Sequence, residues 1–383
     1  MKLKNRYGAA AIVLSMAVLT ACSGKSGSDT TDASNEMTTR VIYMADNTAD
    51  AGNSDTREAA EVPEGMYLSE LTGEPIDEAI KNQRPIAVMV DNERTALDHF
   101  GTAEADVVYE MMNSTANDRI TRLMVMVKDW GKIKQLGSIR STRPTNLMLF
   151  QEWNAVLCHD GGPAVHINAY LANDYTPRFN GSFSRVDNGK PTEFTEYILE
   201  GDLERNFSNS GVSPEYDDYR LEDESHFEFI PYGLTVDLET DYSGAFDAKE
   251  IDMTKVFFHN GSRLVYNDKT ETYDYYEYGA PHTDGEDDEV MSFKNVFLQD
   301  ASFTQLDDNG YLVYNIQTAD YQKGYYITNG KGVEIFWTKP QTLEHTRYYI
   351  YNDKGLLEEI TINTGKTYIG LIPHDTWDDL EIK

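Results

Sequence analysis

Short runs of apolar residues, each closed by polar ones, recur between residues 84 and 173 and constrain the fold more than any other feature of the chain. A run of about four to eight apolar residues between turn signals is typical of a buried strand. We therefore predict strands at residues 85–90, 105–109, 123–127, 136–139 and 155–158. Helical patterns separate some of these runs, at residues 144–153, where Pro144 suits the first turn, and at residues 164–171. Strands that alternate with helices predict an α/β sheet.

The pattern changes near residue 235, where apolar and polar residues begin to alternate and tyrosine becomes frequent. Turn pairs such as Asn260-Gly261 and Asn329-Gly330 separate the candidate strands, which is typical of antiparallel hairpins. These strands are predicted at residues 264–266, 273–278, 295–298, 311–316, 332–337, 347–351 and 367–371. We expect an α+β protein: an N-terminal α/β sheet domain at residues 63–234, followed by a mainly antiparallel β domain at residues 235–383.

A polar, irregular stretch at residues 181–228 lies between these patterns. One helix is expected in it, at residues 196–207. Long stretches with little regular structure are commonly binding or active-site loops.

The N-terminus has the layout of a lipoprotein signal peptide at residues 1–21. Three basic residues precede an apolar stretch at residues 9–19, which is short for a membrane-spanning helix. Leu19-Thr20-Ala21-Cys22 then matches the bacterial lipobox, in which the cysteine is lipidated and becomes the mature N-terminus. The alternative is ordinary secretory cleavage after Ala21 with an incidental cysteine. Residues 22–62, rich in Ser, Thr, Asp and Gly, are expected to form a flexible tether.

Charge excludes several classes of protein. Acidic residues outnumber basic ones by 65 to 33, for a net charge of −32, which disfavours nucleic-acid binding. An aromatic content of 11% is too high for a disordered acidic tail, and two cysteines are too few for a disulfide scaffold. Removal of residues 1–21 takes away three basic residues and no acidic one, leaving −35. Anionic polymers would be repelled by this chain except at a local basic site.

Polar residues follow successive predicted strands, where ligands commonly bind in an α/β sheet. These candidate ligand-binding residues are Asp91, Asn92, Glu110, Arg140, Arg143, His159 and Asp160.

The string Arg140-Ser141-Thr142-Arg143-Pro144 is the most distinctive of these segments. Two arginines beside the start of a helix could hold a phosphate or a carboxylate through bidentate hydrogen bonds, and Ser141 or Thr142 could cap the helix. The alternative is a structural network of ion pairs with Asp91, Glu110 or Asp160.

The string Cys158-His159-Asp160-Gly161-Gly162 suggests a loop that faces a ligand, since glycines allow close approach of the backbone. Neighbouring residues of a strand point to opposite faces, so Cys158 is expected to be a buried apolar residue rather than a nucleophile. Asp91, Glu110, His159 and Asp160 lack the spacing of a known metal motif, and no metal or cofactor is expected.

Several strings resemble the YerB-type lipoproteins of Gram-positive bacteria, which carry a two-part domain of unknown function. The resemblance spans roughly residues 84–373 and implies an envelope lipoprotein, without an established reaction. One departure is that an Arg-rich stretch ending in Pro-His is expected after the glycine loop, whereas Pro191 is followed by Thr192. The strings that carry the resemblance include Pro85-Ile-Ala-Val-Met-Val-Asp91-Asn92, Ala105-Asp106-Val-Val-Tyr109-Glu110, Ile120-Thr121-Arg122, Gly137-Ser-Ile-Arg140-Ser141-Thr-Arg143-Pro144, His159-Asp-Gly161-Gly162, Gly279-Ala-Pro-His282-Thr-Asp284 and Gly365-Lys366-Thr367-Tyr368.

These observations favour a non-catalytic binding or accessory protein on the outer face of the cell membrane, anchored by lipid on Cys22. Its partner would be a cell-wall polymer or an envelope protein. One alternative is a hydrolase or transferase whose anionic substrate is held by Arg140 and Arg143, with Asp91, Glu110, Asp160 or His159 as general acid or base. A second alternative is a structural scaffold.

Overall fold

The computed structural model describes residues 58–173, 175–217, 225–352 and 354–383. The predicted signal peptide, Cys22 and most of the predicted tether lie outside the described residues. Within these four ranges, no helix is both long enough and apolar enough to span a membrane.

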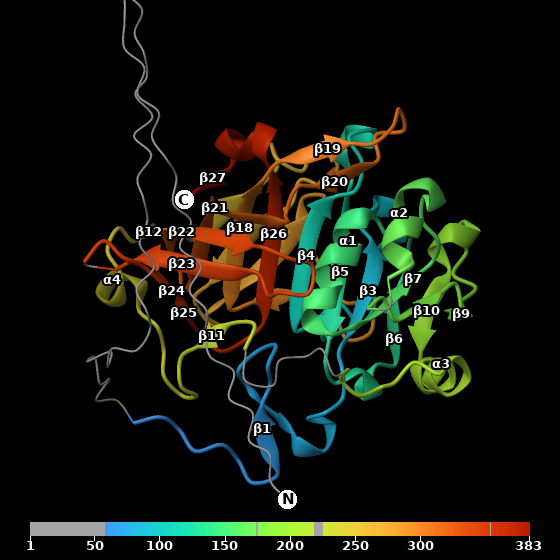
Figure 1. Ribbon diagram of the computed structural model, residues 1–383, viewed down its shortest axis with the longest axis horizontal. Coiled ribbons are helices and arrows are strands. Elements are labelled where there is room, and N and C mark those ends of the chain that lie inside the picture. The colour runs from blue at the N-terminus through green and yellow to red at the C-terminus, as the bar shows by residue number, and fades with distance from the viewer. Residues whose placement is uncertain (1–57, 174, 218–224, 353) are drawn as a thin grey trace, which may run out of the picture. The chain divides into compact units, whose positions relative to one another are not determined.

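A large sheet carries most of the fold (Figure 1). Its order is β24-β23-β22-β21-β18-β26-β4-β5-β3-β7-β8, with β12 paired to β22. In that order the strands span Leu357–Glu359, Arg347–Tyr351, Lys331–Lys339, Thr318–Thr328, Asn295–Ala301, Thr367–Pro373, Val107–Met112, Thr121–Val127, Ile86–Asp91, Val156–His159 and Arg178–Asn180, and β12 spans Phe246–Asp247. The strands β3, β4, β7 and β26 run in the same direction, and β5 runs antiparallel between β3 and β4.

Strand β26 joins the two predicted halves of the chain. Ile369 lies opposite Tyr109 of β4 on one side and opposite Phe297 of β18 on the other, and both pairings are parallel. In Figure 1, β26 (red) lies between β18 (orange) and β4 (teal). The described residues belong to one compact unit. The expected α+β class is confirmed, and strands from residues 63–234 and 235–383 share this sheet.

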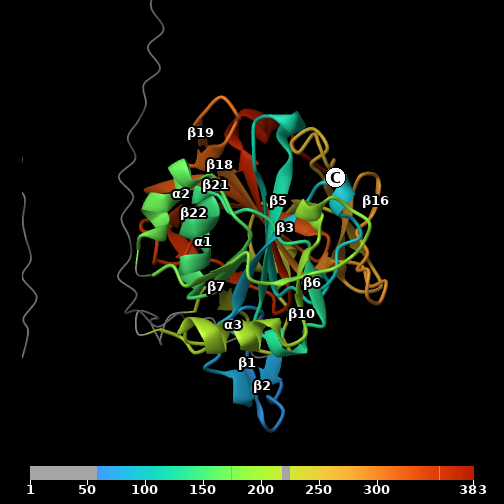
Figure 2. The ribbon, with the colours of Figure 1, turned by 90° about the vertical axis from the view of Figure 1, so that its right-hand side faces the viewer.

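Alternate residues of the central strands pack on opposite faces of the large sheet, as a period of two requires. On β3, Ala87 and Met89 contribute to one core with Leu147, whereas Val88 contributes to the other core with Leu264. Figure 2 shows α1 (Pro144–Leu149) and α2 (Ala164–Leu171) on one side of the large sheet and β16 on the other.

A second sheet covers the face opposite α1. It has the order β16-β15-β14-β13-β27, and β17 pairs with β15. These strands span Ala280–Pro281, Thr272–Glu277, Arg263–Asn267, Glu250–Asp252, Glu381–Ile382 and, for β17, Ser292–Phe293. Buried Tyr273 and Tyr275 of β15 pack in one core with Val108 and Val125 of the large sheet.

Smaller elements complete the described fold. The remaining strands form β1 (Met66–Leu68) with β2 (Pro75–Asp77), β6 (Gln135–Gly137) with β10 (Glu196–Leu199) and β9 (Ser184–Arg185), β11 (Glu228–Phe229) with β25 (Thr361–Ile362), and β19 (Phe303–Gln305) with β20 (Leu312–Tyr314). The other α-helices are α3 (Asp202–Ser210) and α4 (Leu238–Asp241). Short 3₁₀ helices span Glu78–Ile80, Arg94–Ala96, Asn117–Arg119, Trp130–Lys132, Phe150–Trp153, Thr192–Phe194 and His374–Asp379.

Two local predictions need correction. The helix predicted at residues 196–207 is wrong at its start, because residues 196–199 form β10 between β6 and β9. Gly201 then adopts a positive φ of 83° and α3 begins at Asp202. The run at residues 136–139 does form a strand, β6, but in this smaller sheet rather than the large one.

Candidate functional site

Three arginines gather near the end of β3, and we call Arg122, Arg140 and Arg143 the arginine cluster. Asp91 ends β3 and lies opposite Arg122 of β5 in the strand register. The Asp91 carboxylate is 2.5 Å from Nε of Arg140 and 3.6 Å from a terminal nitrogen of Arg122. Arg122 also donates a 2.8 Å hydrogen bond to the carbonyl of Ser141. The string that contains Arg140 and Arg143 is thereby held against the ends of β3 and β5.

Arg143 forms no ion pair with a carboxylate of the described residues. Its guanidinium donates to the Thr142 carbonyl at 2.9 Å and lies over the Tyr311 ring, 4.5 Å from the centroid. Burial, together with the positive charges of Arg122 and Arg140, lowers the pKa of Arg143 to about 9. The Nε atoms of Arg122 and Arg143 are buried without a hydrogen-bond partner in the described parts of the chain. These groups are suited to an anion.

The glycine loop after β7 lies beside the arginine cluster. The Thr142 amide donates to the Gly161 carbonyl at 3.2 Å, and the Asp160 amide donates to the Arg140 carbonyl at 3.0 Å. Gly162 has a φ of 152°, and a methyl group on it would lie 2.5 Å from Cδ1 of Ile167 and 3.0 Å from the Thr142 carbonyl. Glycine is therefore required there by both conformation and space.

His159 and Cys158 are both buried side chains at the end of β7. Nδ1 of His159 is 2.8 Å from the Gly161 carbonyl, and burial lowers the pKa of the imidazole. Its Nε2 is buried and unpartnered among the described residues. Cys158 is fully buried, and burial raises the pKa of its thiol, which disfavours the reactive thiolate.

A pair of carboxyl groups borders the cluster. One terminal nitrogen of Arg185 lies 2.9 Å from both Asp160 and Glu196. Burial, together with the hydrogen bond to Asp160, raises the pKa of Glu196 to about 7. Burial alone would raise the pKa of Asp160 as well, but hydrogen bonding with Glu196 and Arg185 outweighs it and lowers that pKa.

The segment that departs from the expected Pro-His string borders the cluster too. The carboxylate of Glu193 is 3.1 Å from a terminal nitrogen of Arg140, whose guanidinium lies 5.3 Å from the centroid of the Phe194 ring. Thr192, which follows Pro191, accepts a 2.8 Å hydrogen bond from Arg185.

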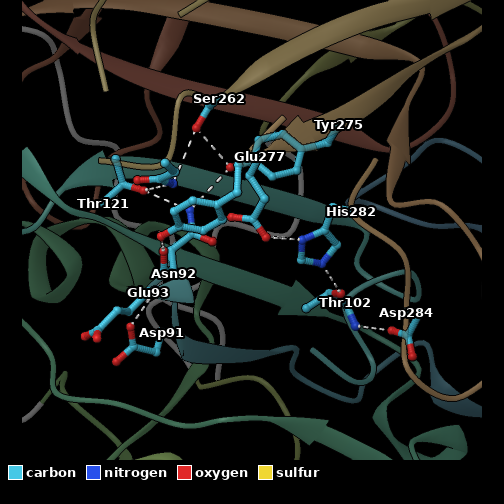
Figure 3. Close-up of polar contacts among 12 residues, drawn as sticks. Asp91, Asn92, Glu93, Thr102, Thr121, Ser262, Tyr275, Glu277, His282 and Asp284 are labelled. Atoms are coloured by element: carbon cyan, nitrogen blue, oxygen red, sulfur yellow. Dashed lines mark hydrogen bonds and ion pairs between the residues drawn. The ribbon is translucent and has the colours of Figure 1, made fainter. Parts of the chain in front are cut away.

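Asn92 and Glu110 do not join the arginine cluster, contrary to the expectation of one shared site. Figure 3 shows Asn92 directed toward Thr121 and Ser262, with Asp91 directed away from them. Residues 91 and 92 are neighbours at a strand end, so their side chains point to opposite faces. Glu110 lies on the same face of the large sheet as Asn92, where Tyr275 of β15 contacts it.

The buried Glu110 carboxylate accepts hydrogen bonds from several strands. Its donors are Thr121 at 2.8 Å, Ser262 at 2.7 Å, Asn260 at 3.1 Å, Asn92 at 3.4 Å, Tyr275 at 3.1 Å and Tyr368 at 2.7 Å. Burial raises the pKa of Glu110, although hydrogen bonds from Ser262 and Tyr368 oppose the shift. These donors belong to β5, β15 and β26, to the segment before β14 and to the residue after β3, so this carboxylate ties the two halves of the chain together.

The sequence pattern indicated neither Arg122 of the cluster nor Tyr311, whose ring contacts Arg143. Arg122 stands at the start of an apolar strand, where a polar residue is ordinarily assigned to a turn. Tyr311 is distant in sequence and only the fold brings it near the cluster.

Two cavities lie away from the arginine cluster, and no residue of the cluster lines them. The lining of the first, of about 520 Å³, includes Lys294 and Lys366, and the lining of the second, of about 390 Å³, includes Tyr325 and Trp377.

Comparisons with known proteins identify two matching regions of this chain. Residues 71–213 match the family described as "Protein of unknown function (DUF3048) N-terminal domain", and residues 253–369 match its C-terminal domain. "Putative lipoprotein YerB" of Bacillus subtilis (strain 168) is 24% identical over 311 residues, covering 79% of this chain and 85% of the relative. The crystal structure of YerB protein from Bacillus subtilis matches with a TM-score of 0.66 at 21% identity, covering 83% of this chain and 99% of that one. The chain has the same fold, and it belongs to the YerB-type lipoprotein family with its two-part domain of unknown function.

Proposed function

We propose that this protein is a membrane-anchored binding protein of the cell envelope that holds an anionic group of a cell-wall polymer in the arginine cluster. The observation that carries this proposal is a buried excess of positive charge. Arg122 and Arg140 share the buried carboxylate of Asp91, whereas the buried Arg143 pairs with no carboxylate of the described residues. Arg140 also pairs with Glu193 at the edge of the cluster, and Arg122 and Arg143 each keep an unpartnered Nε within the described structure.

Burial makes this arrangement costly without a ligand. An unsatisfied buried donor costs about 1–3 kcal/mol, and a charged one costs more. A phosphate or carboxylate would accept hydrogen bonds from the cluster and neutralise part of its charge. The whole chain carries −32, so this cluster is a local exception to its charge.

Anchoring through Cys22 would place the cluster near the membrane surface. A chain with the composition and length of residues 22–62 has a root-mean-square span of roughly 35 Å, which lets the folded part reach wall polymer near the membrane.

The anchor is tested by Cys22→Ala, which is expected to move the protein from the membrane fraction to the medium or the soluble fraction. The control is Cys158→Ala, which removes the other cysteine and is expected to leave the protein in the membrane fraction. Retention of the Cys22→Ala protein on washed membranes would contradict the lipid anchor.

Binding is tested by titrating the protein with a short poly(glycerol phosphate) chain and with inorganic phosphate. Arg143→Ala is expected to weaken binding about tenfold or more, since a charge-assisted hydrogen bond contributes about 1.5–3 kcal/mol. The matched control is Arg263→Ala, which removes an arginine from β14. Binding that is equally strong in both variants, or that is absent from the wild type, would refute the proposal, and a loss of stability alone would favour the scaffold.

A second function is favoured by the Asp160–Glu196 pair. A carboxyl group with a pKa of about 7 beside an anion-binding cluster could act as general acid or base in hydrolysis or transfer. Asp91 is engaged by two arginines and Glu110 lies on the other face, so neither supplies this role. The test is turnover of a phosphodiester substrate, which Glu196→Gln would abolish while leaving phosphate binding intact.

A further inference from the structure

Two histidines and a glutamate meet in a buried cluster away from the arginine cluster. His99 belongs to the segment before β4, Glu277 ends β15, and His282 follows β16. Each offers one ligand atom, and these three atoms lie within 4.8 Å of one another. The exposed fractions are 0% for His99 and 3% for the other two residues, so the cluster is closed to bulk water.

The hydrogen bonds of this cluster are incomplete. Nδ1 of His282 is 2.7 Å from Oε1 of Glu277, and its Nε2 is 2.9 Å from the hydroxyl of Thr102 (Figure 3). The Asp91 carbonyl lies near the His99 ring, but neither ring nitrogen makes a hydrogen bond of good geometry with a described residue. Oε2 of Glu277 is also buried and unpartnered within the described ranges. Buried polar groups are ordinarily satisfied, so something that donates or accepts here is missing.

The chemistry of the unpartnered atoms indicates a cation. Both ring nitrogens of His99 lack a hydrogen-bond partner among the described residues, so one of them can offer a lone pair to a metal. Glu277 would supply a negatively charged oxygen. Two imidazole nitrogens and one carboxylate oxygen form a known ligand set for zinc and related divalent transition metals.

An acidic loop covers the cluster. Residues 286–289 are Glu-Asp-Asp-Glu and are exposed, directly after buried His282 and Asp284. The Gly285 amide donates to the His99 carbonyl at 2.7 Å, which holds this loop over the cluster. Acidic residues at the surface raise the local concentration of cations.

We propose that His99, Glu277 and His282 bind a zinc ion, which links the segment before β4 to the β15–β16 hairpin. The ligands come from segments nearly 180 residues apart in the chain and are closed to bulk water, so a bound ion would hold these segments together. Metal bound only to the folded state stabilises that state by mass action.

The experiment uses the full mature chain without a histidine tag. Elemental analysis after purification in zinc-containing medium is expected to find about one zinc per chain, and chelation followed by zinc addition is expected to lower and then restore Tm. Cobalt, added to the stripped protein, is expected to give the visible absorption of a nitrogen- and oxygen-coordinated ion. Magnesium is expected to do neither, because imidazole ligands suit it poorly.

Variants separate metal binding from simple packing. His99→Ala and the near-isosteric Glu277→Gln are each expected to abolish zinc retention and the cobalt spectrum. His374→Ala is the matched control, since that exposed histidine contacts Asp300 outside the cluster. Wild-type protein that holds no zinc and shows no Tm change or cobalt spectrum would overturn the proposal in favour of a buried water. Retention of zinc by both cluster variants would overturn it as well.

Discussion

At the scale of single residues, Glu196 has the most consequential ionisation beside the candidate site. Its side chain is 1% exposed, and the Asp160 carboxylate and Arg185 flank it. Its pKa of about 7 means that the folded protein holds a proton over a pH range in which an unfolded glutamate has lost it.

The consequence is a pH dependence of stability with a definite sign. Between pH 5 and 7 the folded state binds more protons at Glu196 than the unfolded state, so the free energy of unfolding falls as pH rises. Glu196→Gln is expected to remove about 2 kcal/mol of that fall. Urea unfolding of both proteins at pH 5 and pH 7 measures it.

Two other carboxyl groups also affect how stability changes with pH. Asp106, whose pKa burial raises to about 6, contributes a slope of the same sign in both proteins, so only the difference between them is diagnostic. Asp160 has a lowered pKa and contributes stability that is lost at lower pH, below the chosen window. Identical slopes in the two proteins would contradict the assignment to Glu196.

The sequence predicts only some of the residues that the structure brings together at the candidate site. The order of residues locates Asp91, Arg140 and the glycine loop at strand ends, and the structure places these three together. Which face of the sheet a side chain occupies is a separate question. Asn92 and Glu110 point to the face opposite Asp91, because side chains alternate between the two faces along a strand. The sequence alone does not show which segments cover each face of the sheet, and those segments make the two faces different sites.

At the scale of secondary-structure elements, Tyr368 connects β26 to the buried carboxylate of β4. Its hydroxyl donates to Glu110 at 2.7 Å. Tyr368→Phe is expected to lower the free energy of unfolding by about 1.5–3 kcal/mol, the range for hydrogen bonds to charged groups. Chemical denaturation measures this change.

The matched control is Tyr351→Phe, which removes a hydroxyl from the half-exposed face of β23. Its expected effect is within about 0.5 kcal/mol, as for most surface substitutions. Equal losses in the two variants would show that the contact with Glu110 has no special weight.

Elements were predictable where hydrophobic pattern is strong. The runs that became β3, β5 and β7 are apolar throughout, so burial on both faces left little ambiguity. Strand β21 was not predicted, because its first half reads Thr-Ala-Asp-Tyr-Gln-Lys and is largely exposed. Pairing with β22 makes that stretch a strand, and such a pairing leaves no local trace. The same holds for β10, where pairing with β6 outweighs a helical pattern.

At the scale of the whole molecule, the shared sheet predicts cooperative unfolding. Removal of β26 would leave both β4 and β18 with an unpaired edge. We expect residues 58–383 to show a single transition in calorimetry, and residues 58–234 alone to lack a cooperative transition. Two separate transitions in the longer chain, or a stable shorter one, would contradict this expectation.

The order of strands was beyond prediction from sequence. Local pattern indicates which residues are buried, but it carries no information on which distant strand lies beside which. The two-part pattern of the chain, α/β and then β, is real at the level of composition. It does not reveal that β26, close to the C-terminus, is inserted between β18 and β4.

That insertion bears on how the protein is made. A ribosome produces β4 more than 250 residues before it produces β26, so the nascent chain carries an apolar strand with one unpaired edge for most of its synthesis. Unpaired strand edges promote association between chains, and domains generally fold as units during synthesis. This architecture delays pairing of that edge until β26 has been synthesised. A truncated translation product that ends before β26 would therefore be a substrate for chaperones and proteases rather than a shortened but working protein.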